Sequence, residues 1–174
     1  MAADDSVCAI RRLEERDFAP VTELARTIWL AHYVTMITTE QIEYMLRGRF
    51  TLENLRRYLG SHERWMDVLE CNGRLVGYCS YARTSTPGEI KLEQLYLLPE
   101  LHGRGLGRQM LDHVERRALE EGGRSLMLQV NRRNDKGLAL YRRGNFTVRE
   151  AIVFDVGEGF VMDDYVMVKR LAEP

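Results

Sequence analysis

The chain has 174 residues and a formal net charge of −1, and hydrophobic and charged residues make up 45% and 29% of it. These values are typical of one globular domain and exclude a disordered or fibrous chain, and a charge near zero argues against a general nucleic-acid binder. No apolar run approaches the ~20 residues that cross a bilayer, and the N-terminus lacks the apolar segment of a secretory signal, so we expect no membrane association and a cytoplasmic protein.

The first third of the chain is expected to be mainly helical. Residues Cys8–Leu13 have the pattern of a short strand, and Asp17 then stands where an N-cap precedes a helix that runs through Ile28. Thr39 is expected to cap a second helix, and Thr51–Leu59 to form a short amphipathic piece.

From Trp65 onward the period changes to that of strands. The Asn72-Gly73 dipeptide separates two apolar runs, which predicts a hairpin because a type I′ turn needs two residues with positive φ. The next strand, Glu89–Leu98, alternates. Its expected faces are Ile90, Leu92 and Gln94 on one side, and Lys91, Glu93, Leu95 and Leu97 on the other.

The second half of the chain alternates helices with strands. Gly105–Glu121 carries an apolar stripe of helical period, and Asn134 is placed to cap a shorter helix. The expected strands are Ser125–Val130, Thr147–Val156 and Val161–Lys169. Three consecutive strands followed by two strand–helix crossovers predict an α/β fold, a mixed α+β sheet with helices on its faces.

Cysteines and histidines give no sign of a crosslinked or metal-bound fold. Cys8, Cys71 and Cys79 are odd in number and lack CxxC spacing, so the sequence predicts neither a disulfide framework nor a zinc ribbon. The four histidines show no metal-ligand spacing, and we therefore expect no metal.

A Gly- and Arg-rich turn before the Gly105–Glu121 helix is the most informative stretch. N–H groups and the macrodipole at a helix N-terminus favour an anion, and glycines let phosphate oxygens approach the backbone. Residues 102–149 also carry eleven Lys/Arg against five Asp/Glu, which indicates an anionic ligand unless the charges are scattered at random. The dinucleotide fingerprint GxGxxG fails because Arg108 replaces its last glycine, and the Gly-Lys-Ser/Thr of a P-loop is absent.

Two motifs resemble those of the GNAT superfamily of acetyl-CoA-dependent N-acetyltransferases. The family's pyrophosphate motif, Gln/Arg-x-x-Gly-x-Gly/Ala, is similar to the turn His102-Gly103-Arg104-Gly105-Leu106-Gly107, where His102 departs from the pattern. The family's Asn-x-x-Ala-x-x-Phe/Leu-Tyr-x-x-x-Gly-Phe is similar to Asn134-x-x-Gly137-x-x-Leu140-Tyr141-x-x-x-Asn145-Phe146. There Gly137 replaces Ala, and Asn145 replaces Gly, whose positive φ Asn tolerates well.

The resemblance spans residues 8–172 and implies a single N-acetyltransferase domain with acetyl-CoA as co-substrate. It also implies a mostly antiparallel sheet that is splayed between its fourth and fifth strands, with helices on both faces. The backbone of Leu95, Tyr96 and Leu97 is expected to bind the pantetheine arm, together with Asn134. The pyrophosphate is expected to lie on Gly103, Arg104, Gly105, Leu106, Gly107 and Arg108.

An amine that attacks a thioester must lose a proton, the developing oxyanion must be stabilised, and the leaving sulfur should be protonated. The resemblance implies Tyr141 as the general acid, and by position we choose the Leu97 N–H for the oxyanion. Gln129 stands where some family members have a glutamate base and cannot take a proton. Glu93 is then the better base, directly or through water, because alternation places it on the face of Leu95 and Leu97. The alternatives are a solvated carboxylate for Glu93 and core packing for Tyr141.

The acceptor amine is expected across the splayed strands, between the first two helices and the last hairpin. Trp29, His32, Tyr33, Tyr44 and Met45 offer walls there, although core packing is the preferred interpretation of Trp29 and Met45.

The identity of the acceptor stays open. Asp163-Asp164 could attract a cationic amine or could be a solvated strand entry. The acceptor is a small-molecule or peptide amine, with a polyamine, an amino acid, an aminoglycoside and a protein N-terminus as alternatives. The oligomeric state is also open, with a homodimer as one option. A rival function on the same fold is a non-catalytic acyl-CoA-binding sensor or regulatory partner.

Overall fold

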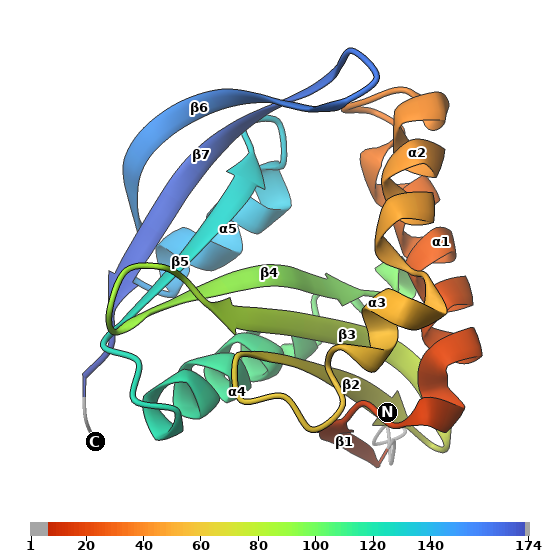
Figure 1. The fold of residues 1–174 in the computed structure, drawn as a ribbon, viewed down its shortest axis with the longest axis horizontal. Coiled ribbons are helices and arrows are strands. Elements are labelled where there is room, and N and C mark those ends of the chain that lie inside the picture. Colours follow the sequence, from red (N-terminus) through yellow and green to blue (C-terminus); the bar gives the residue numbers. More distant parts are fainter. Residues whose placement is uncertain (1–6, 173–174) are drawn as a thin grey trace.

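The computed structural model describes residues 7–172 and places seven strands in one sheet, in the order β1-β2-β3-β4-β5-β7-β6 (Figure 1). The strands are β1 (Cys8–Arg12), β2 (Arg64–Cys71), β3 (Arg74–Arg83), β4 (Glu89–Leu97), β5 (Ser125–Asn131), β6 (Thr147–Gly157) and β7 (Phe160–Arg170). The helices are α1 (Phe18–Tyr33), α2 (Thr39–Arg49), α3 (Leu52–Arg56), α4 (Leu106–Glu120) and α5 (Asp135–Arg143), with 3₁₀ turns η1 (Glu15–Asp17) and η2 (Pro99–Leu101).

The sheet opens between β4 and β5. Neighbouring strands are antiparallel except these two, which are parallel. Their pairing is short and runs from Glu89 opposite Ser125 to Leu92 opposite Leu128. Beyond Leu92 the two ribbons separate, as Figure 1 shows. The predicted mixed, mostly antiparallel sheet with a splay between its fourth and fifth strands is confirmed.

The separation begins at a β-bulge in β4. Ser80 of β3 pairs with Gln94, but the next residue, Tyr81, pairs with Leu92. Glu93 is therefore an extra residue in β4, and a bulge of this kind bends its strand and increases the local twist. The bend carries the rest of β4 away from β5.

The bulge also corrects the predicted faces of β4. An extra residue shifts the alternation of side chains by one position. Leu95 and Leu97 therefore continue the face of Leu92, while Gln94 lies on the face of Lys91 and donates to the Ser80 hydroxyl at 2.9 Å. The expectation that Glu93 shares a regular strand face with Leu95 and Leu97 is wrong, because simple alternation does not hold through a bulge.

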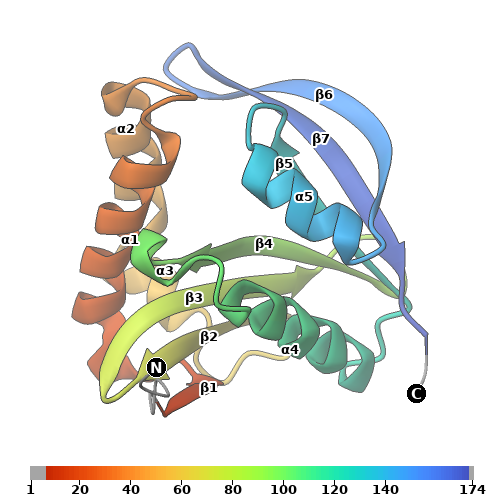
Figure 2. The same ribbon diagram turned by 180° about the vertical axis from the view of Figure 1, so that it is seen from behind.

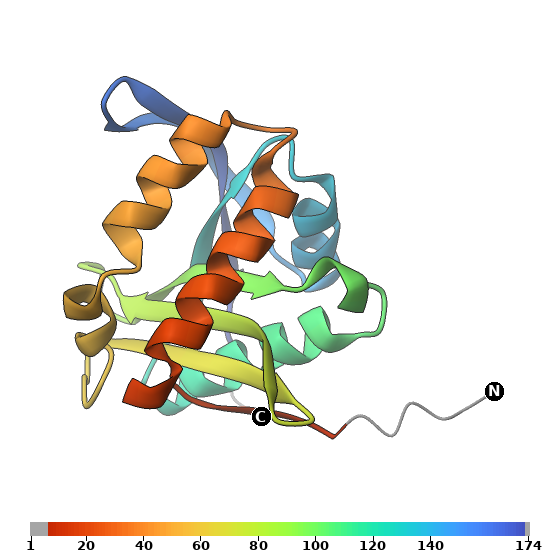
Figure 3. The same cartoon turned by 90° about the vertical axis from the view of Figure 1, so that its right-hand side faces the viewer.

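Helices α1 and α4 cover opposite faces of the central strands (Figures 2 and 3). On one face, Trp29 of α1 donates from Nε1 to the hydroxyl of Tyr78 in β3, at 2.8 Å. On the other face, Met110 of α4 packs so closely on β3 that a Cβ added to Gly77 would lie 3.3 Å from its sulfur. The same Cβ would lie 2.8 Å from the backbone oxygen of Tyr96 in β4, and this contact with the neighbouring strand requires glycine at this position.

Two turns contain Asn or Gly where the backbone has a positive φ, as the sequence predicts. Asn72 and Gly73 have φ values of 50° and 77° in the β2–β3 hairpin. Asn145 has a φ of 68° after α5, so the replacement of the family's Gly preserves the turn.

Two helix starts differ in detail from the prediction. Thr38, and not Thr39, caps α2 with its side chain. Asp17 precedes α1, but its carboxylate accepts from Arg11 and from the backbone N–H of Glu14. It therefore joins β1 to the start of α1 instead of capping the helix.

The expectation of no disulfide is wrong for one pair. Cys8 and Cys71 are bonded, and Cys79 is buried and free. The register of β1 and β2 places Cys8 directly opposite Cys71, with 4.1 Å between their Cα atoms, the short spacing of an antiparallel pair without mutual hydrogen bonds. A disulfide is uncommon in the cytoplasm, and the predicted location stays a prediction. Within residues 7–172, no helix combines the length and apolar character of a membrane span.

Candidate active site

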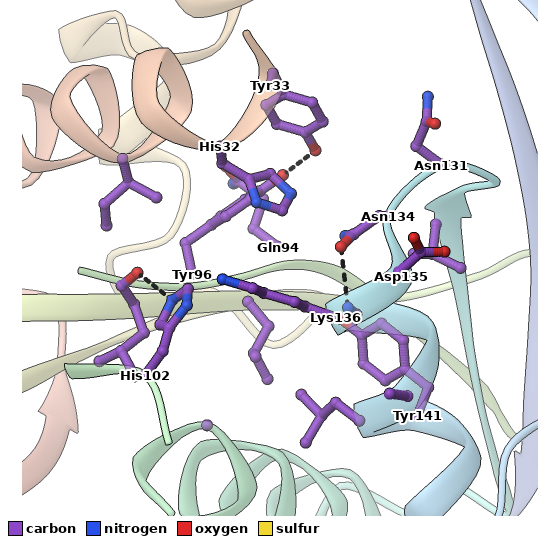
Figure 4. Close-up of a pocket in the computed structure, with 18 of the residues that line it drawn as sticks. His32, Tyr33, Gln94, Tyr96, His102, Asn131, Asn134, Asp135, Lys136 and Tyr141 are labelled. Atoms are coloured by element: carbon purple, nitrogen blue, oxygen red, sulfur yellow. Dashed lines mark hydrogen bonds between the residues drawn. The ribbon is translucent and has the colours of Figure 1, made fainter. Parts of the chain in front are cut away.

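A cavity of about 760 Å³ opens where β4 and β5 separate. Its walls come from these two strands, the C-terminal end of α1, the η2 turn and α5 (Figure 4). This volume is within the usual range for a small-molecule or cofactor site.

The β4 backbone presents a polar edge at this opening. Leu98 N–H donates to Val76 O at 2.9 Å, so alternation sends the N–H and C=O groups of Tyr96 toward β3 and those of Leu95 and Leu97 away from it. No strand among residues 7–172 pairs with β4 on that side beyond Leu92. An edge of this kind can bind an extended ligand in the manner of an added strand. Of the three predicted backbone positions, Leu95 and Leu97 are therefore placed for it, whereas the Tyr96 backbone belongs to the β3 pairing.

His102, the residue that departs from the family motif, contacts this edge. Its Nε2 lies 3.0 Å from Leu97 O, and a dashed line at His102 in Figure 4 marks this contact. Because a carbonyl can only accept, the ring nitrogen donates in this contact. The Leu97 carbonyl is thereby satisfied within the protein, and the N–H of the same residue remains as the donor at this edge.

The turn between η2 and α4 has the backbone that its glycines predict. Gly103 and Gly105 have φ values of 78° and 81°, and Gly105 is the N-cap of α4. Apart from its chain neighbours, nothing described lies within 4 Å of a Cβ built on either residue. Gly103 and Gly107 line the cavity. The other predicted members of the turn, Arg104, Gly105, Leu106 and Arg108, do not.

Arg108 is directed along the outside of α4. Its Nε lies 2.8 Å from Asp112 Oδ1, and a terminal nitrogen donates to Arg143 O at 3.3 Å. The second contact connects α4 to the last residue of α5. A pyrophosphate contact from Arg108 would require both contacts to rearrange.

Helix α5 carries the second group of predicted residues. Asn134 Oδ1 accepts from the Gly137 N–H at 2.9 Å, which confirms the predicted cap. A Cβ on Gly137 would lie 2.5 Å from the amide nitrogen of Asn134, so the replacement of the family's Ala by Gly suits this cap geometry. Tyr141 follows about two helical turns later and lines the cavity.

The Tyr141 phenol is enclosed but accessible to a ligand. It is 9% exposed, and its ring packs edge-on against Phe146 with 5.7 Å between centroids. Burial, with a smaller effect from Tyr96, raises the pKa of the Tyr141 hydroxyl, which is therefore protonated at neutral pH. Within residues 7–172 this hydroxyl has no hydrogen bond to another side chain. Its proton is available to a molecule in the cavity.

Aromatic residues at the end of α1 divide between core and cavity. Trp29 is 1% exposed and belongs to the core, as expected. Tyr33 and Tyr96 share a hydrogen bond of 2.5 Å between their hydroxyls, and both line the cavity. His32 packs against Tyr33 and lines the same wall, and burial lowers the pKa of His32.

A second cavity of about 670 Å³ adjoins the first at Glu93. Its walls come from α2, α3, the start of β2 and the β6–β7 hairpin, and they include Tyr44 and Met45. Glu93 is the one residue of the described chain that lines both cavities. Gln129 lines only the first cavity and accepts from Lys91 Nζ at 2.7 Å. The bulge thus places the candidate base at the junction.

The two adjacent acidic residues of β7 have different surroundings. Asp163 is exposed and lies 3.4 Å from Arg132. Asp164 is 4% exposed, and its Oδ1 has no hydrogen-bond partner among the described residues. Burial and the charge of Asp163 raise the pKa of Asp164 to about 6, with Lys91 opposing. Neither aspartate lines a cavity, so the structure gives no support to their attracting an amine.

Asp164→Asn is expected to stabilise the protein above about pH 6. A carboxyl whose pKa is raised from 3.8 to about 6 on folding binds its proton more tightly in the folded state. Its contribution to the free energy of unfolding is therefore present below about pH 4 and falls by ~3 kcal/mol as pH rises through 6. Urea unfolding from about pH 4 to pH 8 should show this fall in wild type and a smaller fall in Asp163→Asn, which removes the charge that helps to raise the pKa of Asp164. A parallel fall in Asp164→Asn would contradict the assignment.

Several cationic residues of the first cavity are absent from the sequence prediction. Arg133, Lys136 and Arg143 line it from α5 and the preceding turn. The corresponding sequence signal is the excess of Lys/Arg over residues 102–149, which indicates an anionic ligand without selecting residues. In the described part of the chain, no group of three or more His, Cys, Asp or Glu side chains is arranged to hold a metal ion.

A comparison with known proteins shows which protein family this chain matches. Residues 22–145 match the family model described as Acetyltransferase (GNAT) family. A spermidine N(1)-acetyltransferase of Thermoplasma acidophilum is 26% identical over 158 residues, which is 88% of this chain and 94% of that protein. An uncharacterised N-acetyltransferase of Mycobacterium tuberculosis is 27% identical over 135 residues, covering 78% of this chain and 85% of that protein.

Solved structures share the fold. The PaiA N-acetyltransferase of Thermoplasma acidophilum in complex with coenzyme A superposes with a TM-score of 0.80 at 23% identity, over 94% of this chain and 99% of that one. YncA of Salmonella typhimurium, with acetyl-CoA, gives a TM-score of 0.68 at 24% identity, over 97% and 96% of the two chains.

Proposed function

The chain belongs to the acetyltransferase (GNAT) family, and from this premise we propose that it moves an acetyl group from acetyl-CoA to a primary amine by direct attack of the amine. We take residues 8–172 as the catalytic domain. The observation that carries the proposal is the separation of β4 and β5, which brings the Leu97 backbone, Tyr141 and Glu93 to one opening.

The residues present fit acetyl-CoA. The backbone edge at Leu95 and Leu97 suits the extended amide-containing arm, and Asn134 lines the same cavity. Gly103 and Gly105 leave open backbone at the N-terminus of α4, where a pyrophosphate is favoured by N–H groups and the helix dipole. Lys136 lines the cavity nearby and adds positive charge.

Acetyl-CoA supplies an activated acetyl thioester when it is bound. The Leu97 N–H then serves as the donor toward the thioester carbonyl oxygen, where negative charge develops. Tyr141 keeps its proton at neutral pH and holds it at Oη for donation to the leaving sulfur. The enclosing walls of α1 and α5 reduce the access of water to these groups.

Glu93 is proposed to take the proton of the amine. It lies at the junction of the two cavities, so an amine that enters from the second cavity passes its carboxylate before it reaches the first. A water between Glu93 and the amine would serve as a relay without changing the role of the carboxylate.

A non-catalytic acyl-CoA-binding sensor or regulatory protein on the same fold is the alternative. Such a protein needs the backbone edge and the phosphate-binding turn but no proton donor. Tyr141 has its hydroxyl in the cavity without a partner among the described side chains, which favours the enzyme.

Coenzyme A is expected to raise the melting temperature of the wild-type protein by roughly 5–10 °C at about 100 times Kd, since it binds only the folded state. Gly105→Glu should remove this shift, because it places a side chain and a negative charge where the phosphates belong. The matched control is Gly60→Glu, at a residue with a similar φ of 66° and open surroundings outside both cavities. A normal shift in Gly105→Glu would show that the turn is not the phosphate site.

A further inference from the structure

The second cavity is lined by an unusual number of cations. Arg47, Arg49, Arg57 and Arg64 all face it, and its carboxylates are Glu93 at the junction and Glu158 at the hairpin tip. A cavity lined mainly by one sign of charge concentrates ligands of the opposite sign. The walls of the second cavity are therefore mainly positively charged. A site that only bound a cationic amine next to Glu93 would not need this positive charge.

Three of these guanidinium groups have no carboxylate partner in the described chain. Arg57 pairs with Glu53 at 3.1 Å. No carboxylate of residues 7–172 lies within 4.0 Å of a guanidinium nitrogen of Arg47, Arg49 or Arg64. Their positive charge is therefore available to a ligand.

Two of the unpaired groups are held over aromatic rings. The guanidinium carbon of Arg49 lies 5.7 Å from the Trp29 centroid, and that of Arg64 lies 5.8 Å from the Tyr58 centroid. Packing of this kind limits the motion of a guanidinium group and leaves its N–H groups for a planar anion. Burial lowers the pKa of Lys91, and the charge of Arg49 adds a smaller effect in the same direction, so its field extends to the region where β4 and β5 separate.

We propose that the acceptor is a small amine that also carries an acidic group, with its amine at Glu93 and its acid on Arg49 and Arg64. This inference rests on the proposed function and names the substrate class for it. The cavity carries both charge signs, a carboxylate at the junction and guanidinium groups without carboxylate partners, which suits a zwitterion and disfavours a polycation. A volume of about 670 Å³ is within the usual range for small-molecule sites and is large enough for a molecule of amino-acid size.

The test uses the full chain with acetyl-CoA and matched amines. The common L-amino acids are each compared with their carboxamides, together with aminomethylphosphonate and spermidine, and free thiol is measured. We expect kcat/KM to be about 10-fold or more higher for at least one acid-bearing amine than for its neutral counterpart. The phosphonate distinguishes a carboxylate site from a site for any acid.

Arginine variants then locate the acid-binding site. Arg49→Gln and Arg64→Gln should raise KM about 10-fold or more for the preferred acid and leave KM for its carboxamide nearly unchanged. The control is Arg56→Gln, since Arg56 is exposed, pairs with Glu15 and lies outside both cavities. Equal effects on acid and amide, or wild-type preference for spermidine, would overturn the inference while leaving the acetyltransferase intact.

Binding separates failure of this inference from failure of the proposed function. Calorimetry of the coenzyme A complex with the same acid–amide pairs needs no turnover. If the acid binds more tightly than its carboxamide and Arg64→Gln removes this difference, the inference is supported. If, in addition, no amine releases free thiol from acetyl-CoA, only the proposed function is contradicted. Equal binding of both amines overturns the inference.

Discussion

Replacing Tyr141 with Phe is expected to lower kcat by about 10²-fold or more and to leave KM for acetyl-CoA nearly constant. The change removes one hydroxyl and keeps the ring that packs against Phe146. Because that hydroxyl has no side-chain partner among residues 7–172, the melting temperature should hardly change. The loss would then report a proton transfer made only in the transition state.

The identity of the leaving thiol gives a sharper test of this role. A thioester whose thiol has a lower pKa releases its sulfur with less help, so the defect of Tyr141→Phe should shrink on that substrate. Tyr81→Phe is a suitable control, because the buried Tyr81 hydroxyl donates to Asp67 at 2.8 Å and should affect stability without affecting kcat. A wild-type kcat in Tyr141→Phe, or an equal defect on both thioesters, would return Tyr141 to a packing role.

Local chemistry made most of the fold predictable. The positive φ of Asn145 and the cap at Asn134 depend on residues within a few positions, and both follow from side-chain chemistry alone. The parallel pairing of β4 and β5 follows from the crossover through α4, because a strand reached by a helical crossover usually runs parallel.

Features set by strand register were not predictable from one sequence. The bulge at Glu93 results from how β4 pairs with β3. The apolar residues shift from Ile90 and Leu92 to Leu95 and Leu97 across it, but the sequence alone does not show that this shift is a bulge opposite β3. The Cys8–Cys71 bond likewise depends on the register of two strands that lie 63 residues apart. In both cases the decisive partner lies on another strand.

In the candidate site, too, residues that are close in sequence were easier to predict than residues that meet only in the fold. The residues proposed for the cofactor side could be selected from the sequence because they are close together in it, as Gly103–Arg108 and Asn134–Tyr141 are. The proposed acceptor side is the second cavity, whose walls come from α2, α3, the start of β2 and the β6–β7 hairpin, and its arginines meet only in the folded chain. Isolated arginines between residues 47 and 64 are ordinary surface charges until the fold places them around one cavity.

Glu93→Gln is expected to lower kcat/KM at neutral pH by about 10²-fold or more, the usual scale for a general base. Gln has the same size and cannot accept the proton of the ammonium group. The bulge gives this residue its position between the two cavities, so the substitution tests the chemistry of the carboxylate without disturbing the backbone pairing. The measurement is kcat/KM for the best amine as a function of pH.

The pH dependence decides whether the carboxylate takes the proton. With a base removed, the amine must reach its neutral form in solution, so the activity of Glu93→Gln should rise with pH up to the pKa of the amine and recover part of the loss there. Glu158→Gln is the matched control, because Glu158 is the other carboxylate of the second cavity and lies at the hairpin tip away from the junction. If Glu93→Gln keeps both the rate and the pH profile of wild type, the proton goes to water or to another residue, and Glu93 only contributes negative charge where an ammonium group enters.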